Sequence, residues 1–162
     1  MVNEKVGVYA HSVNALTVAT IPRMDDETLS AWRALLNAHA RVTARVESAL
    51  AEAGLPPLSW YDVLWPLHRA PGRRLRVGAL AEQVTLSRTG LTRLLDRVER
   101  DGLIGRQPAP EDRRGSYVVI TAAGSAVLGK MWPVYERALE DAFAARLRSP
   151  RALKRALAPL GD

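Results

Sequence analysis

The fold of this chain is decided by residues 76–121, which read RVGALAEQVTLSRTGLTRLLDRVERDGLIGRQPAPEDRRGSYVVIT. We expect a short helix at 78–83, a tight turn, and a longer helix that begins after Ser87, a good N-cap. Asp101-Gly102 is a strong helix stop. Two strands follow at 103–107 and 116–120, separated by the polar turn segment PAPEDRRG. The order helix, turn, helix and two-stranded hairpin predicts a winged helix-turn-helix lobe.

A long helix is predicted on the N-terminal side of this lobe. Apolar residues recur at spacings of three and four from Asp25 to Ala53, and Gly54 followed by two prolines ends the pattern. Such a helix would be roughly 40 Å long and needs a packing partner along its length. Ser59 is the expected N-cap of a second helix that runs to about His68, with Pro66 inside it as a kink or early end.

Further helices are predicted on the C-terminal side. Thr121 should cap a long helix at 122–147 that bends at Pro133, and Ser149-Pro150 should start a short terminal helix that reaches about residue 160. Residues 1–24 show no periodic pattern and are expected to form a loose N-terminal arm before a single domain at 25–162. The predicted fold class is therefore mainly α with a small antiparallel β-wing.

The charge of the chain lies largely in the predicted lobe. The chain has 162 residues, a net charge of +6 and no Cys. Residues 73–115 hold ten Arg, no Lys and six acidic residues, and Arg suits bidentate contacts with phosphates and guanine edges. An Arg-preferring, GC-rich genome would also produce this composition. The absence of Cys excludes disulfides and thiol sensing.

Targeting signals are not recognisable in the sequence. No apolar run approaches the roughly 20 residues of a membrane span, and the N-terminus does not resemble a signal peptide. The cytoplasm is the expected compartment, and no membrane partner is expected.

The predicted longer helix offers residues for contact with DNA. Leu91, Leu94, Leu95 and Val98 form its buried stripe, while the other side carries polar and basic residues near its N-terminal half. We expect Thr92 and Arg93 to contact base edges and Arg97 to contact a phosphate or pair with an acid. The remaining DNA-binding candidates at the start of the helix are Ser87, Arg88 and Thr89. A solvated amphipathic surface helix is the alternative interpretation.

The hairpin loop adds a second candidate contact. In the sequence EDRRG, Asp112 is placed to hold an Arg by a charge-assisted bond and so to brace the wing. A second Arg at the tip could then enter a minor groove, where A·T-rich sequence concentrates negative potential. A solvated charged hairpin would have the same composition. The helix and the hairpin together, in this order, are more specific than either feature alone.

These residues resemble the MarR family of winged helix-turn-helix regulators. The resemblance is carried by LTRLLDRVERDGLI at 91–104, DRRG at 112–115 and VITAAG at 119–124, and the long flanking helices extend it over about 26–160. It implies a DNA-binding lobe at about 59–120 and a homodimer built from helices at about 26–53 and 122–160. It also implies that Thr92 and Arg93 read the major groove of double-stranded DNA, that Asp112 braces the wing and that Arg114 enters the minor groove. For Arg113 it leaves two contacts open, one in the same groove and one with the DNA backbone. Members of the family are typically repressors.

Many members of the family release DNA when a small phenolic or anionic ligand binds between the dimer helices and the DNA-binding lobe. In this chain such a pocket could be lined by aromatic, apolar and titratable side chains of the first two helices, with one titratable group to suit the ligand. The candidates are Trp32, His39, Trp60, Leu64 and His68, together with Tyr61 and Trp65. Ordinary packing of the second helix against the first is the alternative.

Two other function classes fit the sequence less well. No phosphate-cradling Gly loop, nucleophile elbow or paired metal motif is found, and the three His lie far apart in sequence, so an enzyme is not expected and no cofactor is predicted. A winged-helix module that contacts proteins and not DNA is the remaining alternative. The Arg pair at the wing argues against it, because protein-binding wings more often expose apolar residues.

Overall fold

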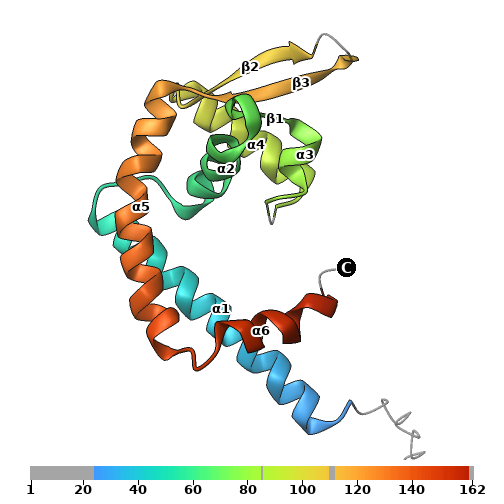
Figure 1. Ribbon diagram of the computed structural model, residues 1–162, viewed down its shortest axis with the longest axis vertical. Coiled ribbons are helices and arrows are strands. Elements are labelled where there is room, and N and C mark those ends of the chain that lie inside the picture. Colours follow the sequence, from blue (N-terminus) through green and yellow to red (C-terminus); the bar gives the residue numbers. More distant parts are fainter. Residues whose placement is uncertain (1–23, 85, 110–111, 161–162) are drawn as a thin grey trace, which may run out of the picture. The chain divides into compact units, whose positions relative to one another are not determined.

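The computed structural model describes residues 24–84, 86–109 and 112–160, with the side chains of Arg88 and residues 112–115 left out (Figure 1). A three-stranded antiparallel sheet accompanies the helices, with the strand order β1-β3-β2, which confirms the predicted class. The helices are α1 (Asp26–Glu52), α2 (Leu58–Arg69), α3 (Val77–Ala81), α4 (Arg88–Arg100), α5 (Ala122–Ala142) and α6 (Pro150–Leu157). The strands are β1 (Arg74–Arg76), β2 (Ile104–Ala109) and β3 (Asp112–Ile120), and short 3-10 turns lie at Pro71–Arg73, Ala144–Arg146 and Ala158–Leu160.

The boundary between two compact units falls inside α1, after Leu35. At the start of α1, Asp25 accepts hydrogen bonds from the backbone N and the hydroxyl of Thr28, both at 2.7 Å. These bonds satisfy a free N–H of the first turn and lower the pKa of the Asp25 carboxyl. The arm predicted at 1–24 lies, except for Met24, outside the described residues.

Two helices end by the same local device. Gly54 follows α1 with φ 66°, and the N–H of Leu55 donates to the Leu50 carbonyl at 2.9 Å. Gly102 follows α4 with φ 74°, and the N–H of Leu103 donates to the Val98 carbonyl at 3.1 Å. This Schellman arrangement needs a residue that tolerates a left-handed backbone, which is why glycine predicted both ends.

The start of α2 differs from the prediction. The helix begins at Leu58 with Pro57 as its N-cap, so Ser59 is not the cap. The N–H of Leu58 instead donates to the Glu47 carboxylate of α1 at 3.2 Å. A carboxylate from a neighbouring helix therefore replaces the expected hydroxyl. The helix also continues through Pro66 to Arg69 without an early end. The carbonyl that Pro66 leaves without its usual helical donor belongs to Asp62, an exposed residue.

The C-terminal helix and the wing also differ from their predicted lengths. α5 ends at Ala142, and a 3-10 turn at Ala144–Arg146 replaces the predicted continuation to 147. No local breaker stands at 143–147, so the sequence offers no signal for this end. β3 starts at Asp112, four residues earlier than expected, so the strands of the wing are longer than predicted.

The core is apolar and lies between the helices and the inner face of the sheet. The predicted stripe of α4 is confirmed, because Leu91, Leu94, Leu95 and Val98 are all buried. On the sheet, Val118, Ile104 and Ile120 are buried on one face. Further members come from α1 and α2 (Val46, Leu50, Val63, Leu64, Leu67) and from α5 (Leu128, Met131).

Stacked rings join α2 to α5. Tyr61 and Trp65 of α2 stack on Tyr135 and Trp132 of α5, with ring centroids 4.4 Å apart for Tyr61–Tyr135 and 5.1 Å for Trp65–Trp132. We call these four residues the aromatic seam. Burial raises the pKa of the Tyr61 phenol, with smaller contributions from Tyr135 and Asp62, and burial also raises the pKa of Tyr135. Both phenols are therefore held in their neutral form.

The seam predicts a loss of stability in alkali. In the folded protein the pKa of the Tyr61 phenol lies above its ordinary value of about 10, so the phenol of the unfolded chain loses its proton first as the pH rises. The contribution of Tyr61 to the free energy of unfolding is therefore complete below about pH 10 and is lost at higher pH. We expect the free energy of unfolding to fall more steeply above pH 10 for the wild type than for the Tyr61→Phe variant. Urea titrations between pH 8 and pH 11 would test this, and equal slopes would contradict it.

The start of α5 is fastened to the turn after α4. The Thr121 hydroxyl accepts from the N–H of Gly124 at 3.0 Å, as expected of an N-cap, and donates to the Gly102 carbonyl at 2.8 Å. The N–H of Thr121 donates to the Leu103 carbonyl at 3.0 Å. These bonds join the start of α5 to the turn after α4, although the β2–β3 hairpin separates the two segments in sequence.

Candidate nucleic-acid interface

Helix α4 presents one polar face outward from the core. The Ser87 hydroxyl accepts from the N–H of Gly90 at 3.1 Å, which confirms Ser87 as the N-cap. The four leucine and valine positions of the stripe fix the rotation of the helix, since they recur at its period. Thr89, Thr92, Arg93 and Arg97 are consequently exposed together on the opposite side.

Basic side chains on this face keep their charge uncompensated. Within the described ranges, neither Arg93 nor Arg97 forms an ion pair with a carboxylate. Their guanidinium donors are thus available to an external acceptor such as phosphate or a base edge. Arg97 does not pair with the nearby acids, which was one of its two expected roles.

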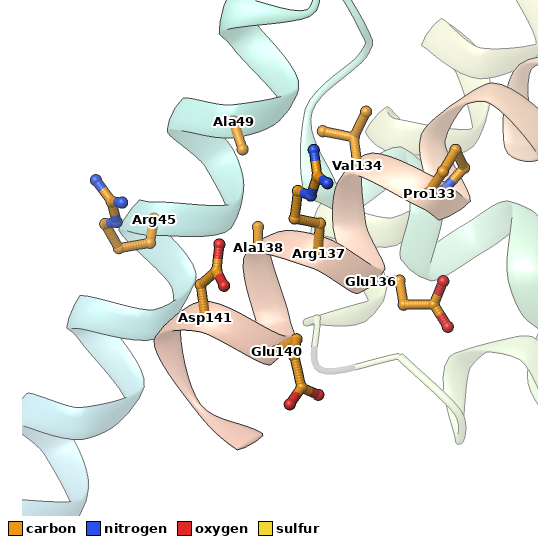
Figure 2. A pocket seen from close by; sticks show the side chains of 9 residues that line it. All are labelled: Arg45, Ala49, Pro133, Val134, Glu136, Arg137, Ala138, Glu140 and Asp141. Carbon is orange, nitrogen blue, oxygen red and sulfur yellow. The ribbon is translucent and has the colours of Figure 1, made fainter. Parts of the chain in front are cut away.

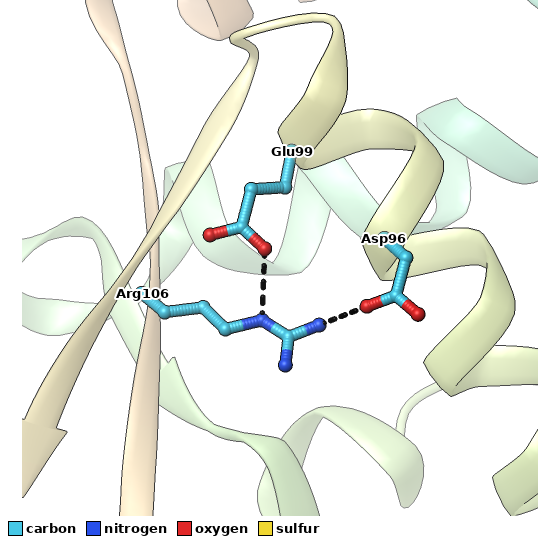
Figure 3. A network of polar contacts seen from close by, with 3 residues as sticks. All are labelled: Asp96, Glu99 and Arg106. Carbon is cyan, nitrogen blue, oxygen red and sulfur yellow. Dashed lines mark hydrogen bonds and ion pairs between the residues drawn. The ribbon is translucent and has the colours of Figure 1, made fainter.

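A residue that the sequence analysis did not single out takes those acids instead. Arg106 of β2 bonds to Asp96 through Nη2 and to Glu99 through Nε, the second contact at 3.0 Å (Figure 3). Asp96 and Glu99 are three residues apart and therefore lie side by side on α4. One guanidinium thus ties the wing strand to α4 and pairs with two carboxylates on that helix. The spacing of Asp96 and Glu99 in the sequence could have indicated a shared basic partner. It could not identify Arg106, because that residue lies in β2 and not in the same helix.

The predicted wing residues lie at an irregular point of the hairpin. Pro108 pairs with Ser116, whereas the next residue, Ala109, pairs with Asp112. The register shift leaves residues 113–115 without a direct partner on β2, and a bulge of this kind bends the strand locally. The side chains of Arg88, Asp112, Arg113 and Arg114 fall outside the described part of the structure, so the predicted brace and minor-groove contact stay predictions.

The residues predicted for a ligand pocket occupy different environments. Leu64 is fully buried in the core, Trp60 and His68 are half-buried, and Trp32 and His39 are exposed. The Nδ1 atom of His68 is buried and has no hydrogen-bond partner within the described ranges. Tyr61 and Trp65 belong to the aromatic seam, where the rings fill the space between the helices.

A cavity of about 950 Å³ opens elsewhere, between the C-terminal half of α1 and α5 (Figure 2). None of the seven pocket candidates lines it. Its lining is charged and of mixed sign, with two basic residues (Arg45 and Arg137), three acidic residues (Glu136, Glu140 and Asp141) and small side chains at Ala49 and Ala138.

Two other kinds of site can be judged on the described residues. These residues contain no group of three or more His, Asp or Glu side chains able to hold a metal ion. Over the same ranges, no helix is long and apolar enough to cross a membrane.

Comparison with known proteins identifies the lobe. A sequence model of the MarR family matches residues 53–115, which span α2 through the start of β3. The chain is 23% identical over 118 residues to YkoM, a transcriptional regulator of the helix-turn-helix type from Bacillus subtilis (strain 168), and the match covers 73% of this chain and 75% of YkoM.

Two solved structures extend the likeness to the flanking helices. AbsC, a MarR family transcriptional regulator from Streptomyces coelicolor, is 28% identical with a TM-score of 0.78, and the match covers 86% of this chain and 95% of AbsC. Sco3205 from the same organism, solved in complex with DNA, is 27% identical with a TM-score of 0.75, and the match covers 87% of this chain and 88% of that one. Residues 53–115 therefore match the MarR family, and the chain as a whole is similar to transcriptional regulators of that family.

Proposed function

We propose that the chain is a homodimeric repressor that binds a pseudopalindromic operator in double-stranded DNA. The observation that carries this proposal is the exposed face of α4, where Arg93 and Arg97 form no ion pair with a described residue while Arg106 pairs with the neighbouring acids. The DNA complex of the similar Sco3205 supports the same partner. Repression would follow from occlusion of a promoter.

In the proposed complex, α4 lies in the major groove. Thr92 and Arg93 contact base edges, with Ser87, Arg88 and Thr89 beside them at the start of the helix, and Arg97 contacts a phosphate. Asp112 braces the wing, Arg114 enters the minor groove and Arg113 contacts the backbone. Arg–phosphate contacts supply much of the affinity and make it sensitive to salt.

The proposed dimer is formed by α1, α5 and α6 of two copies. Large apolar side chains on these helices support it, because Trp32 and Leu36 of α1 are about half exposed, at 54% and 47%, and Trp132 of α5 is 38% exposed. Such a dimer would hold two copies of α4 about one DNA turn, or roughly 34 Å, apart. A small phenolic or anionic effector, if it binds near Trp60 and His68, would change this spacing and release the operator.

The proposal is tested by selecting bound sequences from random duplex DNA at about 150 mM salt, where non-specific binding is weak. We expect a two-fold symmetric motif for the wild type. Arg93→Ala should relax the base preference at one position of each half-site by about 1–3 kcal/mol, whereas Arg114→Ala should weaken binding more evenly across sequences.

Arg100→Ala provides a matched control, since it removes the same charge from the C-terminal end of the same helix, where the side chain is exposed. Equal losses in all three variants would mean that only net charge matters. Absence of any enriched motif for the wild type would favour the alternative, a winged-helix module that contacts a protein.

A further inference from the structure

The densest positive charge of the described lobe lies before α3 and has no part in the contacts proposed above. Residues 69–76 contain four Arg, at 69, 73, 74 and 76, and no acidic residue occurs anywhere between positions 63 and 81. Such a run has no neighbouring carboxylates in sequence to balance it. A surface charge of this density attracts polyanions.

The strand register places part of this charge on the outer face of the sheet. Arg76 of β1 stands opposite Tyr117 of β3, and Arg74 lies two residues earlier on the same face. The other face holds Leu75 opposite Val118, which is fully buried in the core. Arg74, Arg76 and Tyr117 therefore share the face that points away from the core, and we call them the Arg–Tyr face.

Both guanidinium groups are stacked on a single ring. The guanidinium carbon of Arg74 lies 4.6 Å from the centroid of the Tyr117 ring, and that of Arg76 lies 5.6 Å from it. Stacking of this kind holds the plane of the Arg74 guanidinium, and its N–H edges can still donate to a phosphate. Arg74 is exposed and, within the described ranges, forms no ion pair.

The backbone beside this face is in an unusual conformation. Arg73 has φ 53°, a left-handed value that disfavours residues with a Cβ, directly after Gly72 with φ 63°. A glycine at position 73 would relieve the strain, yet an Arg stands there. Strained backbone of this kind persists mainly at sites with a function.

The Arg–Tyr face is continuous with the helix-turn-helix. β1 passes directly into α3, which begins at Val77. In helix-turn-helix complexes the first of the two helices crosses the DNA backbone. A basic face at the entrance to that helix therefore lies next to phosphates, although on the side of the sheet opposite the one that Arg106 uses to reach α4.

We propose that the Arg–Tyr face is a second phosphate-binding surface, which contacts the DNA backbone beside the half-site read by α4 and the wing. This proposal rests on the proposed DNA-binding function. It means that each subunit also contacts duplex DNA outside the half-site. The contact is with phosphate oxygens, so it extends affinity without adding sequence preference.

The test compares two duplexes by fluorescence anisotropy. One carries only the selected operator core, and the other carries the same core with about one helical turn of arbitrary sequence on each side. We expect the wild type to bind the flanked duplex about tenfold more tightly, and Arg74→Ala to lose most of this gain while it binds the core duplex unchanged. The slope of log affinity against log salt on the flanked duplex should fall by about 0.9 for each phosphate that the variant no longer neutralises.

Arg69→Ala is the matched control. Arg69 also stacks on an aromatic ring, 5.6 Å from the centroid of Trp65, but it belongs to α2 and not to the sheet. It should bind both duplexes as the wild type does. Thermal unfolding should be the same for both variants, since both side chains are exposed.

Four results would overturn the proposal. The first is that the wild type binds the flanked duplex no more tightly than the core duplex. The second is that Arg74→Ala loses the same factor of affinity on both duplexes. If the wild type bound the core duplex but Arg74→Ala altered neither affinity, the face would serve an acidic protein or no partner. A wild type that binds neither duplex would overturn the DNA-binding function together with this extension of it.

Discussion

Replacement of Gly124 by Ala is expected to destabilise the protein by about 3 kcal/mol, since a Cβ here overpacks a site closed by backbone. A Cβ at this position would lie 2.1 Å from the Leu103 carbonyl oxygen and 2.9 Å from Cγ1 of Ile120. The carbonyl cannot move aside, because it accepts the hydrogen bond from the N–H of Thr121. The strain therefore falls on the joint between α5 and the turn after α4.

Gly129→Ala is the matched control for this prediction. It lies in the same helix, and a Cβ there would meet nothing within 4 Å. This change should be neutral or should stabilise the protein by up to about 1 kcal/mol, as expected when Ala replaces Gly inside a helix. Chemical denaturation of the three proteins measures both effects. Equal stability of Gly124→Ala and wild type would show that α5 can shift away from Leu103 at little cost.

Signals that act within a few residues allowed much of the DNA-binding lobe to be predicted. The stripe of α4, its cap at Ser87 and its stop at Gly102 all depend on neighbours within one or two turns, and the structure confirms each. Thr121 and Ser149 were predicted as caps for the same reason and serve as caps.

The predictions failed where a distant residue decides the outcome. Ser59 was expected to cap α2, but Glu47, eleven positions before Leu58, takes the first N–H of that helix. Gly124 appeared only as part of the motif VITAAG, whereas its requirement comes from the carbonyl of Leu103, brought close by the hairpin. The α2 aromatics were candidates for a pocket, and their stacking on Trp132 and Tyr135 of α5 depends on a contact between helices far apart in sequence.

Arg106 was missed for the same reason, because its partners Asp96 and Glu99 lie in a different element. The second prediction with a large expected effect concerns this residue. We expect Arg106→Ala to weaken operator binding by at least tenfold while it lowers the free energy of unfolding by only about 1 kcal/mol. The stability effect is small because the side chains of Arg106 and Asp96 are 38% and 51% exposed, and exposed ion pairs are screened by solvent. The DNA effect is larger because β2 loses its link to α4 and two carboxylates are released beside the phosphates.

Two further variants separate these causes. Asp96→Asn with Glu99→Gln, added to Arg106→Ala, removes the released carboxylates but leaves the link broken. If repulsion of phosphate dominates, this triple variant should recover wild-type affinity. If the link positions the helix against the wing, affinity should stay low and the symmetric motif should lose definition, because α4 and the wing would no longer be held in one register on the duplex. We expect the second result, since the Nε contact at 3.0 Å and the Nη2 contact hold the guanidinium at two points.

Arg106→Lys keeps the charge but cannot bridge both acids through a planar group. Its operator affinity should then lie between those of the wild type and Arg106→Ala. Full affinity in Arg106→Ala itself would show that the recognition helix is held by its apolar stripe alone.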